Sequence, residues 1–486
     1  MEYEAVIGLE VHAQAITRSK MYCSCAVVED TGDLEPNTHV CPICLAFPGT
    51  LPVVNRRAVE YGLLTALALH CTVHSENVFS RKSYFYPDLP KGYQISQYDL
   101  PLSSDGYLEV EVGDELRRIG ITRVHLEEDT GKLSHREEGA LVDFNRAGAP
   151  LLEIVSEPDL RTVEEVHAYA TTLRDVLIYL GVNSGDMEKG VMRFEANVSV
   201  RPRGVQELGT RTEIKNLNSF RALNRAVEYE IERQIELLEA GGAVTQHTLG
   251  WDEVEERTYV QRSKEQAHDY RYFPEPDIPP LEITDAWREQ VAAEVPELPL
   301  ARKRRLIETY AIRPYDAALL IRSRTIADYF ERSAELAGER GIEAQEVANW
   351  VTGELFRLLN ENNVTPAEAR ITPEQLVKVL ELRAGDTINV TAAKQVLEES
   401  FKTGEEPEAL VKRLGLAQIS DVSALEDIVA EIIASNPTQV EQYRAGKRAV
   451  IGWFIGQVMK ASRGKANPEQ ARELLAGKLE PEGFSD

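Results

Sequence analysis

The sequence is short of positive charge and has no long apolar run. Its 486 residues carry 80 Asp and Glu against 54 Lys and Arg, a net charge of −26. A chain this acidic does not bind nucleic acid through a general basic coat, so any RNA contact must come from a local basic patch. No apolar run approaches the length of a membrane span, and residues 1–4 lack the layout of a signal peptide. We therefore expect a cytoplasmic protein.

Cysteine is also scarce, with five residues in the chain. Such a sparse set argues against a disulfide framework and is typical of a reducing compartment. Four of them form two close pairs, Cys23-Ser-Cys25 and Cys41-Pro-Ile-Cys44. This spacing predicts a closed structural Zn²⁺ site, the alternative being buried thiols without a metal. Cys71, on the apolar side of a predicted helix, is expected to be a small core residue.

Two common catalytic signatures are missing as well. Gly446-Lys447 and Gly464-Lys465 lack the Ser or Thr that follows the lysine of a Walker loop. A nucleotide would therefore be held by a sheet and metal ions instead of a glycine-rich loop. The chain also shows no Gly/Ser-rich amidase signature and no plausible Cys–His pair for a glutaminase.

The length predicts two to four domains. Strand-like segments occur up to about residue 290, and beyond it the pattern is helical only. We predict a first domain at 1–290, a helical domain at 291–404 and a small helical tail domain at 405–486. In the helical part, Thr365-Pro-Ala-Glu and Thr372-Pro-Glu-Gln are predicted capping boxes, and Asn436-Pro and Asn467-Pro are predicted helix starts.

Residues 192–201 alternate between apolar and polar side chains without a break. The apolar members are Met192, Phe194, Ala196, Val198 and Val200, and the polar members are Arg193, Glu195, Asn197, Ser199 and Arg201. A period of two predicts a β-strand with one face on a core. The polar face is suited to holding phosphates and a metal ion. For one strand alone, an ordinary solvated face is the favoured interpretation.

Four further strand-like segments carry similar polar faces. Their polar members are Glu10 and His12; Arg123, His125 and Glu127; Glu153; and Arg211, Glu213 and Lys215. Together the five segments predict an antiparallel sheet with a carboxylate-rich concave side. Like charges repel there unless cations lie among them, so we expect divalent metals that bridge nucleotide phosphates. Further phosphate-binding candidates are Arg81, Lys82 and Lys91. Taken singly, His12 or His125 is more often a hydrogen-bonded structural residue.

A local basic patch stands out near the C-terminus of this acidic chain. Its candidate RNA-contacting residues are Arg444, Lys447, Arg448, Lys460, Arg463 and Lys465. Glycines 452, 456 and 464 would allow a close approach of the backbone to RNA. Solvated charges on helices are an equally good interpretation of this patch.

Several long motifs resemble those of one family. They are Val6-Ile-Gly-Leu-Glu-Val-His, Arg81-Lys-Ser-Tyr-Phe-Tyr-Pro, His125-Leu-Glu-Glu-Asp-Thr-Gly-Lys, Thr210-Arg-Thr-Glu-Ile-Lys-Asn and His268-Asp-Tyr-Arg-Tyr-Phe-Pro. They are similar to the B subunit of the aspartyl/glutamyl-tRNA amidotransferase, and the resemblance covers nearly the whole chain. It implies an α+β cradle domain similar to the glutamine synthetase catalytic fold, followed by an all-α domain and an all-α tail that grips tRNA.

The resemblance implies a reaction in two steps. ATP phosphorylates the side-chain carboxylate of Glu or Asp misacylated on tRNA(Gln) or tRNA(Asn), and ammonia then displaces the phosphate to give the amide. The implied cofactors are ATP and Mg²⁺, beside the structural Zn²⁺. Since the chain lacks a glutaminase signature, the implied partners are an amidase-type A subunit and a small C subunit in a heterotrimer.

The resemblance also implies roles for particular residues. The metal positions would be Glu10, His12, Glu127, Glu128, Glu195 and Glu213, with Glu127, Glu195 and Glu213 catalytic. The nucleotide would be held by Arg193, Arg201, Asn197, Ser199, Arg211, Lys215, Lys82 and Lys91. The family often has Cys-Asp where this chain has Phe194-Glu195, which lengthens that carboxylate by one methylene. Two alternatives remain, a non-catalytic zinc- and tRNA-binding scaffold and a stand-alone ligase that needs no tRNA tail.

Overall fold

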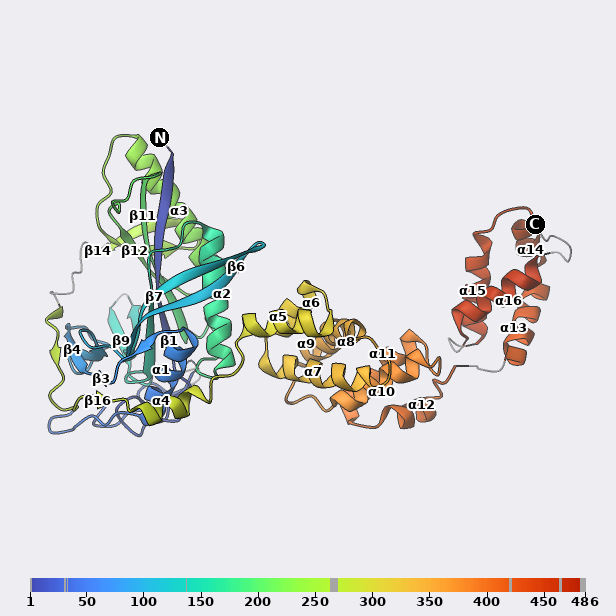
Figure 1. Cartoon of the computed structure of the whole chain (residues 1–486), viewed down its shortest axis with the longest axis horizontal. Helices are drawn as coiled ribbons and strands as arrows, with labels where there is room; N and C mark the ends of the chain where they lie inside the picture. Colours follow the sequence, from blue (N-terminus) through green and yellow to red (C-terminus); the bar gives the residue numbers. More distant parts are fainter. Residues whose placement is uncertain are drawn as a thin grey trace. The chain divides into compact units, whose positions relative to one another are not determined.

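The computed structural model describes residues 2–29, 32, 34–136, 138–262, 270–418, 422–462 and 466–480. The chain divides into two compact units, residues 1–301 and 302–486, which we describe separately (Figure 1). α4 (Asp285–Ala292) spans residue 290 and lies against α1 (Arg56–Ala68) within the first unit. The division into domains at 290 and 405 stays a prediction.

A nine-stranded sheet organises the first unit, in the order β14-β13-β12-β11-β1-β10-β7-β6-β2. All neighbouring strands are antiparallel except β12 and β13. The strands are β1 (Tyr3–Gln14), β2 (Thr72–Val73), β6 (Ser103–Val112), β7 (Glu115–Glu128), β10 (Pro150–Ser156), β11 (Met192–Pro202), β12 (Thr212–Leu217), β13 (Thr248–Asp252) and β14 (Arg257–Arg262). A large antiparallel-rich sheet and a helical C-terminal region, both predicted, are confirmed.

The apolar side of this sheet packs on helices. α1, α2 (Val163–Tyr179) and α3 (Phe220–Glu239) share one hydrophobic core with the sheet. The predicted alternation of β11 is confirmed, since Phe194 and Val198 are fully buried on that core. The opposite side of the sheet is thereby left to the polar members of each strand.

A small three-stranded sheet lies beside the end of β7. It consists of β4 (Phe79–Ser83), β5 (Tyr93–Gln97) and β15 (Phe273–Pro274). Gln94 Nε2 donates to the carbonyl of Glu128 at 2.7 Å, which ties β5 to β7. The remaining strands form two short pairs, β3 (Glu76–Asn77) with β16 (Leu281–Glu282) and β8 (Lys132–Arg136) with β9 (Gly139–Asp143).

The second unit consists of helices around two separate hydrophobic cores. The first core is built from α5 (Pro299–Tyr310), α6 (Pro314–Leu320), α7 (Arg324–Gly338), α8 (Ala344–Trp350), the π-helical turn η2 (Val351–Leu355), α9 (Phe356–Asn362), α10 (Pro373–Ala384), α11 (Val390–Thr403) and α12 (Pro407–Leu414). The second is built from α13 (Val422–Ser435), α14 (Pro437–Arg444), α15 (Val450–Ala461) and α16 (Pro468–Leu479). No helix in the described part of the chain is long and apolar enough to cross a membrane.

One predicted capping box is wrong. Thr372 caps α10 with reciprocal hydrogen bonds to Gln375, as predicted. Thr365 instead lies in a turn after α9, where the carboxylate of Glu368 accepts from its N–H and its hydroxyl. At Thr365 only the Glu368 half of the motif forms, and residues 366–368 make a turn instead of a helix. The helix starts at Asn436-Pro and Asn467-Pro are confirmed.

Candidate functional site

The register of the central strands brings the predicted polar residues onto one face. Glu10 lies opposite Glu195 of β11, and His12 lies opposite Glu153 of β10. Glu153 in turn lies opposite His125 of β7. Residues directly opposite each other in antiparallel strands point to the same side of a sheet. We name the resulting group the carboxylate cluster: Glu10, His12, Glu127, Glu153, Glu195 and Glu213.

His12 stands at the centre of the carboxylate cluster. Its Nε2 lies 3.6 Å from Glu10 Oε1, 3.5 Å from Glu127 Oε1 and 3.6 Å from Glu153 Oε2. Burial alone would lower the pKa of His12, but the hydrogen bond to Glu153 and the charges of nearby carboxylates raise it to about 9. In the apo protein the imidazole is therefore a cation among carboxylates.

Lys215 is the second cation of the site. Its Nζ lies 3.0 Å from Glu195 Oε2 and 3.4 Å from Glu213 Oε1. Although burial opposes it, the charge of Lys215 holds the pKa of Glu195 below its usual value. Burial and the charges of Glu153 and Glu195 raise the pKa of Glu10 to about 8. The cluster therefore holds more negative charge than its own two cations neutralise, which disfavours the ionised form of Glu10.

Three sets of side chains, drawn from the cluster and the adjacent His125, have the composition of a metal site. They are Glu10, His12 and Glu153; His125, Glu127 and Glu153; and Glu10, Glu195 and Glu213. In each set the candidate ligand atoms lie within 4.8 Å of one another. Carboxylate oxygens are the ligands that Mg²⁺ prefers, so the residues fit divalent metals.

Two cavities adjoin the carboxylate cluster. The first, of about 420 Å³, is lined by Arg146, Arg193, Asp129 and Asn218, and we name it the arginine chamber. The second, of about 210 Å³, is lined by Tyr98, Tyr270, Tyr272, Arg123 and Arg211, and we name it the tyrosine chamber. Both are also lined by Glu10, Lys82 and Lys215. Two ligands could therefore approach the cluster from separate chambers and meet at these residues.

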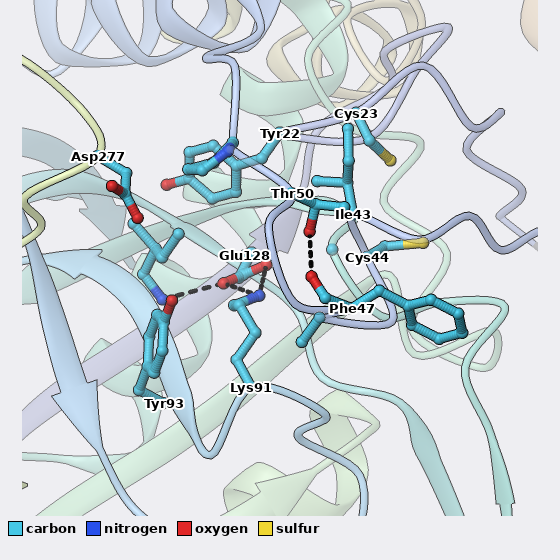
Figure 2. A pocket seen from close by; sticks show the side chains of 14 residues that line it. Tyr22, Cys23, Ile43, Cys44, Phe47, Thr50, Lys91, Tyr93, Glu128 and Asp277 are labelled. Carbon is cyan, nitrogen blue, oxygen red and sulfur yellow. Dashed lines mark hydrogen bonds and ion pairs between the residues drawn. The ribbon is translucent and has the colours of Figure 1, made fainter.

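Five predicted site residues line one or both chambers: Glu127, Arg193, Arg211, Lys82 and Lys215. It does not bring Glu128 and Lys91 there. Since neighbours in a strand alternate in direction, Glu128 points away from Glu127, and its carboxylate lies 2.6 Å from Lys91 Nζ and accepts from the N–H of Ile95 at 3.0 Å. Glu128 and Lys91 instead line a cavity of about 180 Å³ together with Cys23 and Cys44, which Figure 2 shows.

Three other predicted phosphate ligands lie along β11 but away from both chambers. Arg201 pairs with Glu4, with Nε and Oε1 2.6 Å apart, near the far end of the strand. The hydroxyl of Ser199 donates to the carbonyl of Val6 at 3.4 Å. Asn197 lies opposite Gly8 and Glu213. Among the described lining residues, none of the three borders the arginine or the tyrosine chamber.

Three residues of the site, Glu153, Asp129 and Arg146, were missing from the predicted set. Glu153, recognised as a polar strand residue only, belongs to two of the metal-type groups. Arg193 donates to both carboxylate oxygens of Asp129, at 3.0 and 3.1 Å, and Arg146 lies 3.5 Å from it. Against the effect of burial, these arginines lower the pKa of Asp129 to about 2. The sequence signal for Asp129 is its position directly after β7, where it marks the end of the strand.

The four clustered cysteines converge in space. The sulfur atoms of Cys23, Cys25, Cys41 and Cys44 lie within 4.8 Å of one another. The N–H of Cys41 donates to Cys44 Sγ at 3.1 Å, and hydrogen bonds from Cys23 and Cys41 lower the pKa of Cys44 to about 4 although burial opposes this. Four sulfur atoms this close together fit a tetrahedral Zn²⁺. Cys71 lies apart in the main hydrophobic core, as predicted, but it follows the end of α1 and is not on a helix.

The predicted RNA-contacting residues lie in the last helical group. Arg444, Lys447, Arg448 and Lys460 are exposed. The Nε of Arg444 donates to the carbonyl of Leu479 at 3.2 Å, and Arg448 lies 3.2 Å from Glu480, so both also hold the C-terminal helix. Arg463 and Lys465 lie outside the described residues.

Carboxylates clustered between two cavities that also hold lysine and arginine side chains could bind divalent metals beside phosphate groups. Comparison with known families is more specific: residues 5–289 match the family model described as GatB/GatE catalytic domain, and residues 328–479 match the model described as GatB domain. The chain belongs to the GatB family, which confirms the resemblance.

Named relatives match the chain over its whole length. A protein of Moorella thermoacetica, named as the B subunit of the aspartyl/glutamyl-tRNA(Asn/Gln) amidotransferase, is 56% identical over 483 residues, which are 99% of this chain and 100% of the relative. Proteins with the same name from Roseiflexus sp. (strain RS-1) and Carboxydothermus hydrogenoformans are 54% and 53% identical, and the matches cover 99% and 98% of this chain and 99% of each relative.

Proposed function

We propose that the chain catalyses the ATP-dependent conversion of Glu on tRNA(Gln), or of Asp on tRNA(Asn), into the amide, as the names of its relatives indicate. ATP first phosphorylates the side-chain carboxylate, and ammonia then displaces the phosphate. The observation that carries this proposal is the carboxylate cluster placed where two chambers meet. Phosphoryl transfer depends mainly on positioning and on neutralising charge, which this arrangement provides.

The side chains around the cluster suggest how the reactants are held. Mg²⁺, bound by the carboxylate cluster, would neutralise the phosphate oxygens of ATP. Lys82 and Lys215 border both chambers and would hold the phosphate that moves from one reactant to the other. Arg193, fixed by Asp129, would hold a further anionic group in the arginine chamber. We also propose that this cradle resembles the glutamine synthetase catalytic fold, on the basis of its carboxylate-bearing antiparallel sheet.

The ammonia must come from a partner, because the chain has no glutaminase signature. We infer an amidase-type A subunit and a small C subunit in a heterotrimer, as the word "subunit" in the relatives' names suggests. The polar interior next to the cluster would carry ammonia. Replacing Glu128 by Leu should then reduce glutamine-dependent turnover more than turnover with free ammonia, and equal losses would count against this path. Four clustered free thiols, suited to Zn²⁺, support a cytoplasmic location.

The last helical group offers a surface for tRNA. Gly452, Gly456 and Lys460 are spaced four residues apart on α15 and so lie on one side of the helix. A Cβ atom added to either glycine would point into open space, with no other part of the described chain within 4 Å of it. An open helix side with a lysine at its end would let an RNA backbone approach closely. We therefore propose that α13–α16 form a tail domain that binds tRNA.

The proposed function is tested by ATP cleavage and amidation in the presence of misacylated Glu-tRNA(Gln) and Asp-tRNA(Asn). Both should depend on Mg²⁺ and be lost in Glu127→Gln and Glu213→Gln, while Glu164→Gln, an exposed residue of α2, serves as the control. A scaffold without catalytic activity would bind tRNA and show no Mg²⁺-dependent cleavage. That result, with the partner subunits present, would refute the proposed function.

A further inference from the structure

One loop lies between the arginine chamber and the four clustered cysteines, which we name the cysteine quartet. This loop, residues 144–149 between β9 and β10, we name the Arg146 loop. Arg146 lines the chamber, and its Nε and Nη2 donate to the carbonyls of Thr130 and Gly131 at 3.0 and 2.8 Å. Its Nε also lies 3.5 Å from Oδ2 of Asp129. The Arg146 loop therefore holds the Asp129 carboxylate and the two residues that follow it.

The other side of the Arg146 loop is bonded to residues 34–44, which we name the cysteine loop because it contains the second cysteine pair. Asn145 is 2% exposed and uses both ends of its side-chain amide there. Its Oδ1 accepts from the N–H of His39 at 2.8 Å, and its Nδ2 donates to the carbonyl of Glu35 at 2.9 Å. Two adjacent residues thus face opposite sides, Asn145 toward the cysteine loop and Arg146 toward the chamber.

A buried lysine joins the same two loops to the cysteine quartet. Lys20 is 1% exposed, and its Nζ donates to the carbonyls of His39 and Phe144 at 2.8 and 3.3 Å. The same Nζ lies 3.7 Å from Sγ of Cys44. A buried ammonium is costly unless it is paired, and four thiolates around one Zn²⁺ keep a net negative charge that an ammonium balances. Groups that bond both to metal ligands and to the surrounding fold fix the geometry of metal sites.

We propose that Asn145 is a positioning residue that links the cysteine quartet to Arg146 in the arginine chamber, with Lys20 as a second link. When the quartet holds a metal, the cysteine loop is fixed, and its hydrogen bonds to Asn145 keep Arg146 against Asp129. When the metal is lost, the cysteine loop loses this cross-link, and the chamber loses its support on that side. The kinetic consequence rests on the proposed function, in which the chamber holds an anionic group of a reactant.

The experiment uses the full chain in complex with its partner subunits. Asn145→Ala is compared with the wild type before and after zinc removal by a chelator. Thr38→Ala is the matched control, because the Thr38 hydroxyl donates within the cysteine loop, to the carbonyl of Glu35 at 2.7 Å. Native mass spectrometry measures the zinc content, and hydrogen exchange is followed in peptides that cover residues 129–131.

Asn145→Ala should retain zinc, and both this substitution and zinc removal should loosen the chamber. Each should speed hydrogen exchange at residues 129–131 about tenfold and lower kcat/KM for amidation about tenfold or more. Thr38→Ala should leave both quantities within about twofold of the wild type. If Asn145→Ala does not fold, zinc removal from the wild type gives the same test.

A double-mutant cycle with Arg146→Ala separates positioning from a general loss of stability. If Asn145 acts through Arg146, then Asn145→Ala and zinc removal should each lower kcat/KM by less than about twofold in the Arg146→Ala background. A loss as large as in the wild-type background would overturn the proposal. Unchanged exchange at residues 129–131 would overturn it too, as would exchange that rises equally throughout the first unit, or a wild-type complex that holds no zinc. Absence of amidation by the wild-type complex would refute the proposed function, while hydrogen exchange would still test the link between the loops.

Discussion

Replacing Lys215 by Met tests whether the carboxylate cluster depends on cations for its stability. Lys215 is the cation that pairs with both Glu195 and Glu213. Methionine keeps most of the side-chain volume and removes the charge. In the variant without bound metal, the negative charges of Glu195 and Glu213 lie near Glu10 and are no longer neutralised by the ammonium of Lys215. We therefore expect a loss of stability that is large without Mg²⁺ and much smaller with it.

The size of the effect follows from the distances. At an effective dielectric constant of about 20, opposite unit charges about 4 Å apart attract by about 4 kcal/mol, and Lys215 makes two contacts of 3.0 and 3.4 Å. The desolvation of the ammonium offsets much of this gain. Breaking a buried pair by removing one partner typically costs about 3–5 kcal/mol. Since a change of 1 kcal/mol shifts Tm by about 2 °C in a unit of this size, the expected shift is about 6–10 °C.

The assay is calorimetric unfolding of the full chain with EDTA and with Mg²⁺ in excess. A metal that binds only the folded state stabilises it in proportion to its occupancy, and it should bind the variant at least as well, because the competing ammonium is gone. Lys215→Arg, which keeps the charge, is the control and should lose far less stability in EDTA. An equal Tm loss with and without Mg²⁺ would show that the cluster does not exchange Lys215 for a metal ion, and the metal assignment would fall.

Three further predictions concern other parts of the chain. Burial would raise the pKa of Glu230, but hydrogen bonds from Arg233, Gln234 and Thr212 outweigh it and lower that pKa. The ionised Glu230 therefore stabilises the fold above its unfolded-state pKa of about 4.3. This stabilisation is lost as the pH falls through the lower, folded-state pKa. Glu230→Gln should thus lower the free energy of unfolding by about 3 kcal/mol at pH 7, and by less in urea titrations at acid pH. The same loss at both pH values would contradict this prediction. Removing Zn²⁺ with a chelator, or the substitution Cys44→Ser, should lower the Tm of the first unit. Native mass spectrometry that finds no bound zinc would refute this prediction. Gly456→Val should weaken tRNA binding about tenfold without lowering Tm. Gly477→Val is the control: this glycine also faces open space on a helix, and its substitution should leave tRNA binding unchanged. Equal tRNA binding by both variants would exclude the α15 side as the RNA surface.

Much of the fold was predictable because burial leaves a periodic trace in the sequence. Phe194 and Val198 alternate with Glu195 and Asn197, and the buried and polar faces of β11 follow that pattern. The α2 and α3 helices likewise follow apolar spacing and their caps, Thr162 and Ser219. Such local signals survive because each residue's environment depends on its own strand or helix.

The composition of the site was less predictable, because it depends on register between distant strands. The sequence identifies Glu153 as a polar strand residue, but only its pairing with His12 and His125 places it within the cluster. Asp129 needs a partner 64 residues away, Arg193, before it becomes part of a chamber. Conversely, Arg201 shares the face of Arg193 in sequence, yet it lies several residues along β11, beyond the reach of the cluster. Periodicity gives the face of a strand but not the position along the sheet at which neighbours converge.

Glu127 and Glu128 show how one step along a strand separates two environments. Glu127 faces His12 among carboxylates, and burial with the charge of Glu153 raises its pKa. Glu128 faces the opposite way and is held by Lys91 beside the cysteine quartet. The two carboxylates therefore join the cluster to the cavity beside the four cysteines through a single peptide unit of β7. A shift of β7 by one residue would exchange their roles, so the hydrogen bonds that β5 makes to Glu128 also keep Glu127 in the cluster.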